Sequence, residues 1–182
     1  MIKIDNLSHS FGEKKVLNDF SAEFDTGIHA LIGKSGSGKT TLLRLIAGLE
    51  KQQTGKISCP KPIAVSFQEN RLLPWYSAKK NISIVSNDNI AEELLKKLGL
   101  EKDINTLPSA LSGGMKRRVS LARALAAQSE TVLLDEPFAG LDENTAIEAL
   151  SIIKEYTVGK TVIISTHNIE IASLLDSITE IK

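Results

Sequence analysis

The chain has 182 residues, of which 42% are hydrophobic, so it is long enough for one domain with its own core. Its 22 Lys and Arg residues equal its 22 Asp and Glu residues, so bulk charge does not indicate nucleic acid or an anionic membrane surface as a partner. The single cysteine, Cys59, excludes an internal disulfide and is typical of a reducing compartment. We expect neither a signal peptide nor a membrane span, because no apolar run approaches about 18 residues.

Short apolar segments alternate with helical patterns along the chain, which indicates a parallel sheet with crossover helices. The strands are predicted over residues 1–7, 16–24, 28–33, 55–59, 63–67, 131–137, 161–167 and 177–182. The helices are predicted over residues 40–49, 89–100, 115–128 and 143–156. In an open parallel sheet, ligands bind at the carboxyl ends of the strands, so we expect the site there.

A glycine-rich segment, GKSGSGKTT, lies between a predicted strand and a predicted helix. It fits the phosphate-binding loop (P-loop) of nucleoside triphosphatases, in which glycines let backbone N–H groups approach the phosphates. Lys39 is expected on the β- and γ-phosphates of ATP and Thr40 on Mg²⁺. The strand and helix on either side disfavour the alternative, a flexible Gly/Ser loop. The predicted nucleotide-binding residues of this loop are Gly33, Lys34, Ser35, Gly36, Ser37, Gly38, Lys39, Thr40 and Thr41.

Two carboxylates end the predicted strand 131–137. An acidic side chain at the end of an apolar strand is costly unless a cation meets it, so Asp135 is expected to hold Mg²⁺ through its water shell. Glu136 points the other way along the strand and is the candidate base for the hydrolytic water. The alternative for either residue is that it only caps the turn at Pro137.

Polar residues also follow two other predicted strands. His167 is a candidate to contact the γ-phosphate or the attacking water, although a histidine in this position is by itself more often structural. Gln68 is expected to ligate Mg²⁺ and the water in front of the γ-phosphate, with a turn residue as the alternative. The predicted catalytic residues are thus Glu136, His167, Lys39 and Gln68, and the predicted metal ligands are Thr40, Gln68 and Asp135.

A second candidate anion site is formed by Ser112, Gly113 and Gly114, directly before the predicted helix 115–128. A helix N-terminus with bare backbone N–H groups favours an anion. The chain therefore carries two phosphate-binding features.

Several motifs in this order resemble the nucleotide-binding domain of ABC transporters: the loop at 33–41, Gln68, LSGGM at 111–115, LLDEP at 133–137, GLD at 140–142 and STH at 165–167. The resemblance covers nearly the whole chain and implies an α/β P-loop NTPase fold with a RecA-like core. It implies one ABC ATPase domain over 1–182, with an N-terminal antiparallel β-subdomain and a helical subdomain over about 69–128. It also implies that Phe11 stacks on adenine, whereas the alternative is a buried strand-end aromatic.

The resemblance explains the second anion site. In this family two copies associate head to tail around two ATP molecules. Ser112, Gly113 and Gly114 of one copy would contact the γ-phosphate held by the other copy, with Asp142 at the subunit boundary. ATP would then close the homodimer and hydrolysis would open it.

The segment FQENRLLPW, Phe67–Trp75, is similar to that of ATPases from importers of nitrate, sulfonates such as taurine and related solutes. There it forms part of the groove for a transmembrane permease, so Leu72–Trp75 would be an exposed apolar patch. The alternative is that Leu73 and Trp75 pack inside the helical subdomain. We expect a cytoplasmic ATPase, peripheral on the inner face of the cell membrane, with an external solute-binding protein in the full transporter and no nucleic acid partner.

The sequence also leaves two alternative functions to consider. One is a nucleotide-gated clamp or assembly factor. Those members of this class that act on nucleic acid commonly carry long coiled-coil insertions, duplicated cassettes or basic arms, which this sequence lacks. A module that binds ATP without turnover is disfavoured by Glu136 and His167. The sequence departs from the family pattern in three places. Met115 follows LSGG, and the segment between QQTGKIS and IAVSF is trimmed compared with the family's usual hairpin. The third is the expected absence of a C-terminal regulatory domain.

Overall fold

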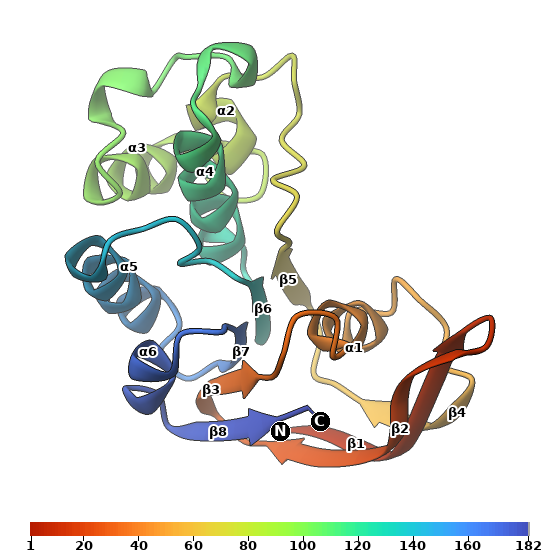
Figure 1. The fold of residues 1–182 in the computed structure, drawn as a ribbon. Coiled ribbons are helices and arrows are strands. Elements are labelled where there is room, and N and C mark those ends of the chain that lie inside the picture. Colours follow the sequence, from red (N-terminus) through yellow and green to blue (C-terminus); the bar gives the residue numbers. More distant parts are fainter. Residues whose placement is uncertain (182) are drawn as a thin grey trace. The chain divides into compact units, whose positions relative to one another are not determined.

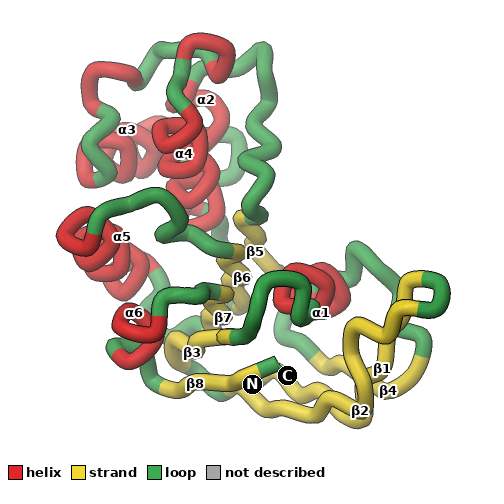
Figure 2. The backbone as a smooth tube through the Cα atoms, in the orientation of Figure 1, coloured by secondary structure: helices red, strands yellow, loops and turns green. Residues whose placement is uncertain are grey.

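The computed structural model describes residues 1–181, and the chain divides into two compact units. The first unit contains residues 1–65, 129–136 and the described residues from 159 onward. The second unit contains residues 66–128 and 137–158. Figure 1 labels the elements of both units, and Figure 2 separates helices, strands and loops by colour.

An antiparallel sheet forms the N-terminal part of the first unit. Its strands, in the order β2-β1-β4, are Lys14–Phe24, Ile2–Phe11 and Thr54–Ser58. Alternate residues of β1, such as Ile2 and Ile4, are buried, as expected for a strand with one face on the core. The ladder between β1 and β2 is irregular beyond Ile4, near Asn6 and Asp19, which both have positive φ.

A five-stranded sheet forms the rest of the first unit, in the order β5-β6-β7-β3-β8. The strands in this order are Ile63–Ser66, Thr131–Asp135, Thr161–Ser165, Gly27–Ile32 and Ser177–Glu180. Strand β7 pairs in parallel with β6 on one side and with β3 on the other. The carboxyl ends of β6, β7 and β3 therefore meet at one edge of the sheet.

Two helices belong to the first unit. Helix α1 (Lys39–Ile46) follows β3, and its Leu42, Leu43, Leu45 and Ile46 are buried. These side chains join a hydrophobic core that includes Ile4, Phe24, Leu31, Leu133 and Ile163, from both sheets. Helix α6 (Ile169–Ser173) connects β7 to β8. Burial of this core fixes α1, and with it the start of the helix, between the two sheets.

The second unit is helical. Its helices are α2 (Ala78–Ser83), α3 (Asp88–Lys97), α4 (Gly113–Ala126) and α5 (Glu143–Tyr156), with short 3-10 turns at Glu101–Asp103 and Pro108–Ala110. The four helices begin at polar N-caps whose side chains accept a hydrogen bond from the backbone N–H three residues later: Ser77, Asn87, Ser112 and Asp142. Local sequence thus sets the start of every helix in this unit.

The predicted fold class is confirmed. All of the predicted strands and helices are present; helix 143–156 has the predicted bounds, and the other elements have ends shifted by one or more residues. Strands β4 and β5 lie in different sheets. Helices α2 and α6 were not predicted, since six and five residues are too few to show helical periodicity. Within residues 1–181, every helix is too short or too polar to cross a bilayer.

Candidate nucleotide-binding site

The loop between β3 and α1 depends on glycine at two close approaches. Gly33 and Gly38 have φ of 153° and 104°, in the region that favours glycine. A Cβ atom on Gly33 would lie 2.6 Å from both the Ile181 carbonyl oxygen and Ser37 Oγ. A Cβ atom on Gly38 would lie 2.7 Å from Val16 Cγ1. The backbone of this loop is therefore shaped by contacts that no other residue type allows.

The Lys39 side chain folds back across this loop. Its Nζ donates to the carbonyl oxygens of Gly33, at 2.7 Å, and Lys34, at 3.2 Å, and the residue is only 8% exposed. An ammonium has three N–H donors, so one is left for a phosphate oxygen. Ser37 Oγ is buried without a hydrogen-bond partner among residues 1–181. A buried hydroxyl and a free ammonium donor in one glycine-rich loop fit the phosphates of a nucleotide.

Asp135 lies at the carboxyl end of β6 and is 3% exposed. Its Oδ2 accepts a hydrogen bond from Thr40 Oγ1 at 2.7 Å, and its Oδ1 accepts one from Ser165 Oγ at 2.5 Å. The carboxylate thus contacts the start of α1 and the end of β7, rather than the turn at Pro137. A hydroxyl beside a carboxylate is a donor set suited to Mg²⁺, which prefers oxygen ligands and keeps several waters. Thr40 and Asp135 fit that ion.

Glu136 and His167 are brought together next to Asp135. His167 Nδ1 lies 2.9 Å from Glu136 Oε2. Glu136 has a positive φ of 50°, and its backbone N–H donates to both the carbonyl oxygen and Oγ of Ser165. A left-handed conformation is unfavourable for glutamate by about 1–2 kcal/mol, and such residues concentrate at functional sites. The turn therefore aims the Glu136 carboxylate at His167 instead of continuing the strand.

Phe11, at the end of β1, is 53% exposed. Its ring makes an edge contact with His9, with ring centroids 4.9 Å apart and an interplanar angle of 81°. The buried strand-end alternative is therefore not what the structure shows. The exposed ring face is available to stack on a planar group.

The second anion feature is in the second unit, where Ser112 caps α4. Ser112 Oγ accepts a hydrogen bond from the Met115 N–H at 3.2 Å. Gly113 and Gly114 are exposed, and a Cβ atom on either would meet nothing within 4 Å. These glycines are thus not required by packing within the chain, and they leave an open helix N-terminus.

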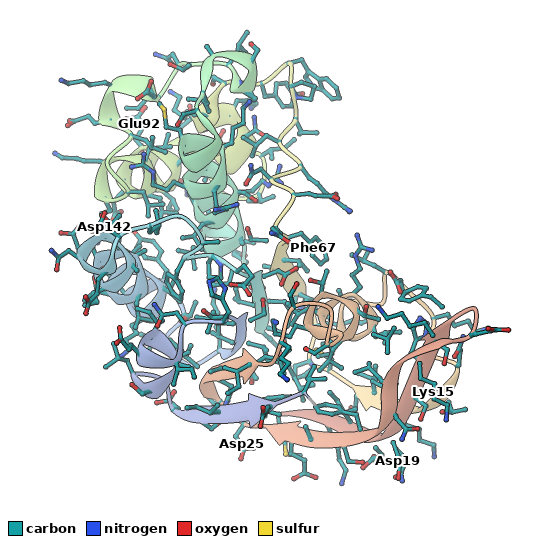
Figure 3. All side chains as sticks on the ribbon, in the orientation of Figure 1. Lys15, Asp19, Asp25, Phe67, Glu92 and Asp142 are labelled. Carbon is teal, nitrogen blue, oxygen red and sulfur yellow. The ribbon has the colours of Figure 1, made fainter. Side chains whose placement is uncertain are left out.

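Two further predicted residues also belong to the second unit. Gln68 is exposed in the bend that follows β5. Asp142 lies at the start of α5 (Figure 3), where its carboxylate accepts hydrogen bonds from Thr145 Oγ1 at 2.6 Å and from the Thr145 N–H at 3.1 Å. These bonds to Thr145 lower the pKa of Asp142. Capping α5 is therefore the role that the structure gives to Asp142.

The Leu72–Trp75 segment is partly exposed: Trp75 is 67% exposed and Leu73 is half-buried. The backbone of this segment is held by hydrogen bonds to the side chain of Asn81, which is fully buried. Asn81 Oδ1 accepts from the Leu73 N–H at 2.8 Å, and Nδ2 donates to the carbonyl oxygens of Leu73, Tyr76 and Ser77 at 2.9–3.1 Å. The apolar side chain of Trp75 is thus presented on a segment whose backbone is held rigidly.

Sequence reasoning missed two residues that organise these sites. Ser165 joins Asp135 to the Glu136 backbone, and the signal for it was a polar residue at the end of a buried strand. Asn81 gave no signal, because an asparagine in a polar stretch normally lies on the surface.

The sequence profile described as ABC transporter matches residues 17–139. The chain belongs to the ABC transporter family. Relatives in this family include two aliphatic sulfonates import ATP-binding proteins. SsuB 2 of Pseudomonas syringae pv. syringae is 40% identical over 181 residues, which cover 96% of this chain and 66% of that protein. SsuB 1 of Paracoccus denitrificans is 37% identical over 183 residues, which cover 96% of this chain and 76% of that protein. The chain spans about two thirds to three quarters of the length of these ABC transporter family relatives.

Solved ABC cassettes share the fold. A dimeric structure of the bacterial ABC transporter cassette MJ0796 has a TM-score of 0.91 and 29% identity. A second dimeric structure of MJ0796, in a post-hydrolysis state bound to ADP and Pi, has a TM-score of 0.90 and 28% identity. Each superposition covers 100% of this chain and 94% of the solved chain.

Proposed function

We propose that this chain is the ATP-binding and ATP-hydrolysing subunit of an importer, which drives a separate transmembrane permease by ATP-dependent head-to-tail dimerisation. The observation that carries the proposal is the cluster at the carboxyl ends of β3, β6 and β7. There the Lys39 loop, the Thr40–Asp135 pair and the Glu136–His167 pair lie on adjacent strands. Membership of the ABC transporter family and the sulfonate import relatives support the same function.

ATP binds through its phosphates to the loop that begins at Gly33. Backbone N–H groups and the free donor of Lys39 meet the phosphate oxygens, and Phe11 offers its exposed ring to adenine. Thr40 and Asp135 would hold Mg²⁺, which offsets the negative charge of the β- and γ-phosphates.

Hydrolysis requires a base for the attacking water, and Glu136 has that role. A carboxylate is an acceptor, so the hydrogen of the His167–Glu136 bond lies on His167 Nδ1. His167 thereby occupies Glu136 Oε2 and leaves Oε1 to accept the proton of the water. His167 is thus a positioning residue for the Glu136 carboxylate.

The second copy completes each site. The open N-terminus of α4, with Ser112, Gly113 and Gly114, offers N–H groups and a hydroxyl to the γ-phosphate held by the partner copy. ATP then stabilises the dimer and hydrolysis removes that stabilisation. Gln68 is proposed to contact Mg²⁺ and the attacking water, and Asp142 to lie at the subunit boundary. The dimeric form of both MJ0796 structures supports this arrangement for the family.

The permease would dock on the Leu72–Trp75 segment, since an exposed tryptophan on a rigid backbone is typical of a partner site. The system would import small organic anions such as sulfonates, with an external solute-binding protein. The chain would then lie on the cytoplasmic face of the membrane.

The experiment is a pull-down from detergent-solubilised membranes with the full chain as bait, followed by identification of the captured membrane protein. A permease captured by the wild type and not by Trp75→Ser would support transport. Capture of no membrane protein, from a chain that still hydrolyses ATP, would favour the nucleotide-gated clamp.

A further inference from the structure

A cavity of about 400 Å³ lies within the second unit. Its wall is formed by the end of α3, the first half of α4, the segment 137–141 and α5. None of the residues assigned to catalysis lines it, and that volume is sufficient for a small organic molecule.

The lining combines apolar and cationic side chains. Leu98, Leu121 and Ile152 supply apolar surface. The charged residues of the lining are four cations and one acid: Lys96, Lys97, Arg117, Arg118 and Glu148. The whole chain has equal numbers of positive and negative side chains, so this local excess of positive charge is a property of the cavity. Such a surface favours an anion with an apolar part.

The two arginines form a rigid part of the wall. Arg117 Nη1 donates to the Ala139 carbonyl oxygen, and Arg118 Nη1 donates to the Leu98 carbonyl oxygen at 2.8 Å. These bonds fix each guanidinium without neutralising its charge. The Nε atoms of both side chains are buried and have no hydrogen-bond partner among residues 1–181.

The lysines differ in their pairing. Lys97 is paired with Glu93 and Glu155, so its charge is largely satisfied. Lys96 makes no ion pair with any residue that the structure describes. Two guanidinium groups without a carboxylate partner and one ammonium without an ion pair therefore line a cavity whose lining includes a single carboxylate, Glu148.

We propose that this cavity binds a small amphipathic anion, a carboxylate or sulfonate that carries a short apolar chain. The anionic group meets Arg117, Arg118 and Lys96, and the chain lies on Leu121 and Ile152. The ligand also regulates dimerisation, an inference that rests on the proposed function. Gly114, which is assigned to the partner contact, belongs to the wall, as does Gly140, two residues before Asp142.

The test is calorimetric titration of the full chain, without nucleotide, with 1-hexanesulfonate, hexanoate and 1-hexanol. We expect saturable binding of either anion with one site per chain, and no saturable binding of the alcohol. Lys96→Glu should weaken anion binding about tenfold, whereas the matched control Lys102→Glu, on an exposed residue outside the lining, should not. Glu148→Gln should strengthen anion binding, because it removes the one negative charge in the lining. Misfolding would weaken anion binding, so it could not produce this result.

Absence of saturable anion binding, equal binding of the alcohol, or equal effects of Lys96→Glu and Lys102→Glu would overturn the cavity proposal. Regulation has its own readout, the ATP-dependent dimer fraction with and without 1-hexanesulfonate. If 1-hexanesulfonate changes the dimer fraction of the wild type but not that of Lys96→Glu, the result supports regulation of dimerisation. If it leaves the dimer fraction of the wild type unchanged, regulation is rejected. The titration needs no ATP, so its outcome is independent of the proposed ATPase function.

Discussion

His167 Nδ1 and Glu136 Oε2 are 2.9 Å apart, although the two residues are 31 positions apart in the chain. The pairing of β6 with β7 brings the strand ends together, and the positive φ of Glu136 turns its side chain toward His167. A carboxylate held in this way has one oxygen committed to a hydrogen bond and one left for water.

Glu136→Gln should abolish most hydrolysis and preserve ATP binding. The amide has nearly the shape of the carboxylate but accepts no proton, so we expect a fall of about 100-fold or more in kcat. Phosphate release measures the rate, and the fraction of dimer in ATP should rise as turnover stops. A Glu136→Gln protein that hydrolyses ATP at the wild-type rate would show that Glu136 is not the base.

His167→Ala should lower kcat with little change in the Kd for ATP, because His167 positions Glu136 rather than the nucleotide. In a Glu136→Gln background the same substitution should add little further loss, since residues that act as a unit have non-additive effects. Single-turnover rates of the four proteins of this cycle provide the measurement. Fully multiplicative losses would mean that the two residues act independently.

Gly33→Ala should disrupt the nucleotide loop much more than Gly36→Ala. Both glycines have positive φ, but a Cβ atom on Gly33 would lie 2.6 Å from the Ile181 carbonyl oxygen, whereas a Cβ atom on Gly36 meets nothing within 4 Å. Gly159→Ala, with φ of 76° and open space, is the control for backbone strain alone. ATP affinity and Tm should fall most for Gly33→Ala, and equal losses at all three positions would contradict the steric explanation.

Asn81→Asp should loosen the Leu72–Trp75 segment. The substitution removes the two N–H donors that three carbonyl oxygens share, which costs about 1–3 kcal/mol for a buried group even though Arg123 remains beside the side-chain oxygen. We expect a lower Tm, weaker permease capture and ATP affinity close to that of the wild type. Asn89→Asp, an exposed change of the same chemistry on α3, is the control. Wild-type permease capture by Asn81→Asp would argue against a role for the rigid segment.

Much of the fold could be predicted from the sequence because its signals are local. The apolar strands, the Gly33–Lys39 loop and the N-cap Ser112 are each readable from a few neighbouring residues. The left-handed turn at Glu136 and the burial of Asn81 could not be predicted. Both depend on hydrogen bonds to residues that only tertiary structure brings near, such as Ser165 and Leu73.

The head-to-tail dimer is tested most directly by mixing two inactive variants. Lys39→Ala removes the ammonium that we assign to the phosphates. Ser112→Asp keeps a good N-cap for α4 but would place a negative charge against the γ-phosphate that we propose the partner holds. Each variant alone should hydrolyse little ATP. In a mixed dimer, the loop of the Ser112→Asp copy meets the intact α4 of the Lys39→Ala copy, so one site is complete.

The measurement is the ATPase rate of an equimolar mixture compared with the rate of each variant alone. We predict that mixing restores about a quarter of the wild-type rate per chain, since half of randomly formed dimers carry one of two intact sites. If each site were built within a single chain, no combination of these variants would contain an intact one. A mixture no more active than its components would therefore contradict the shared site.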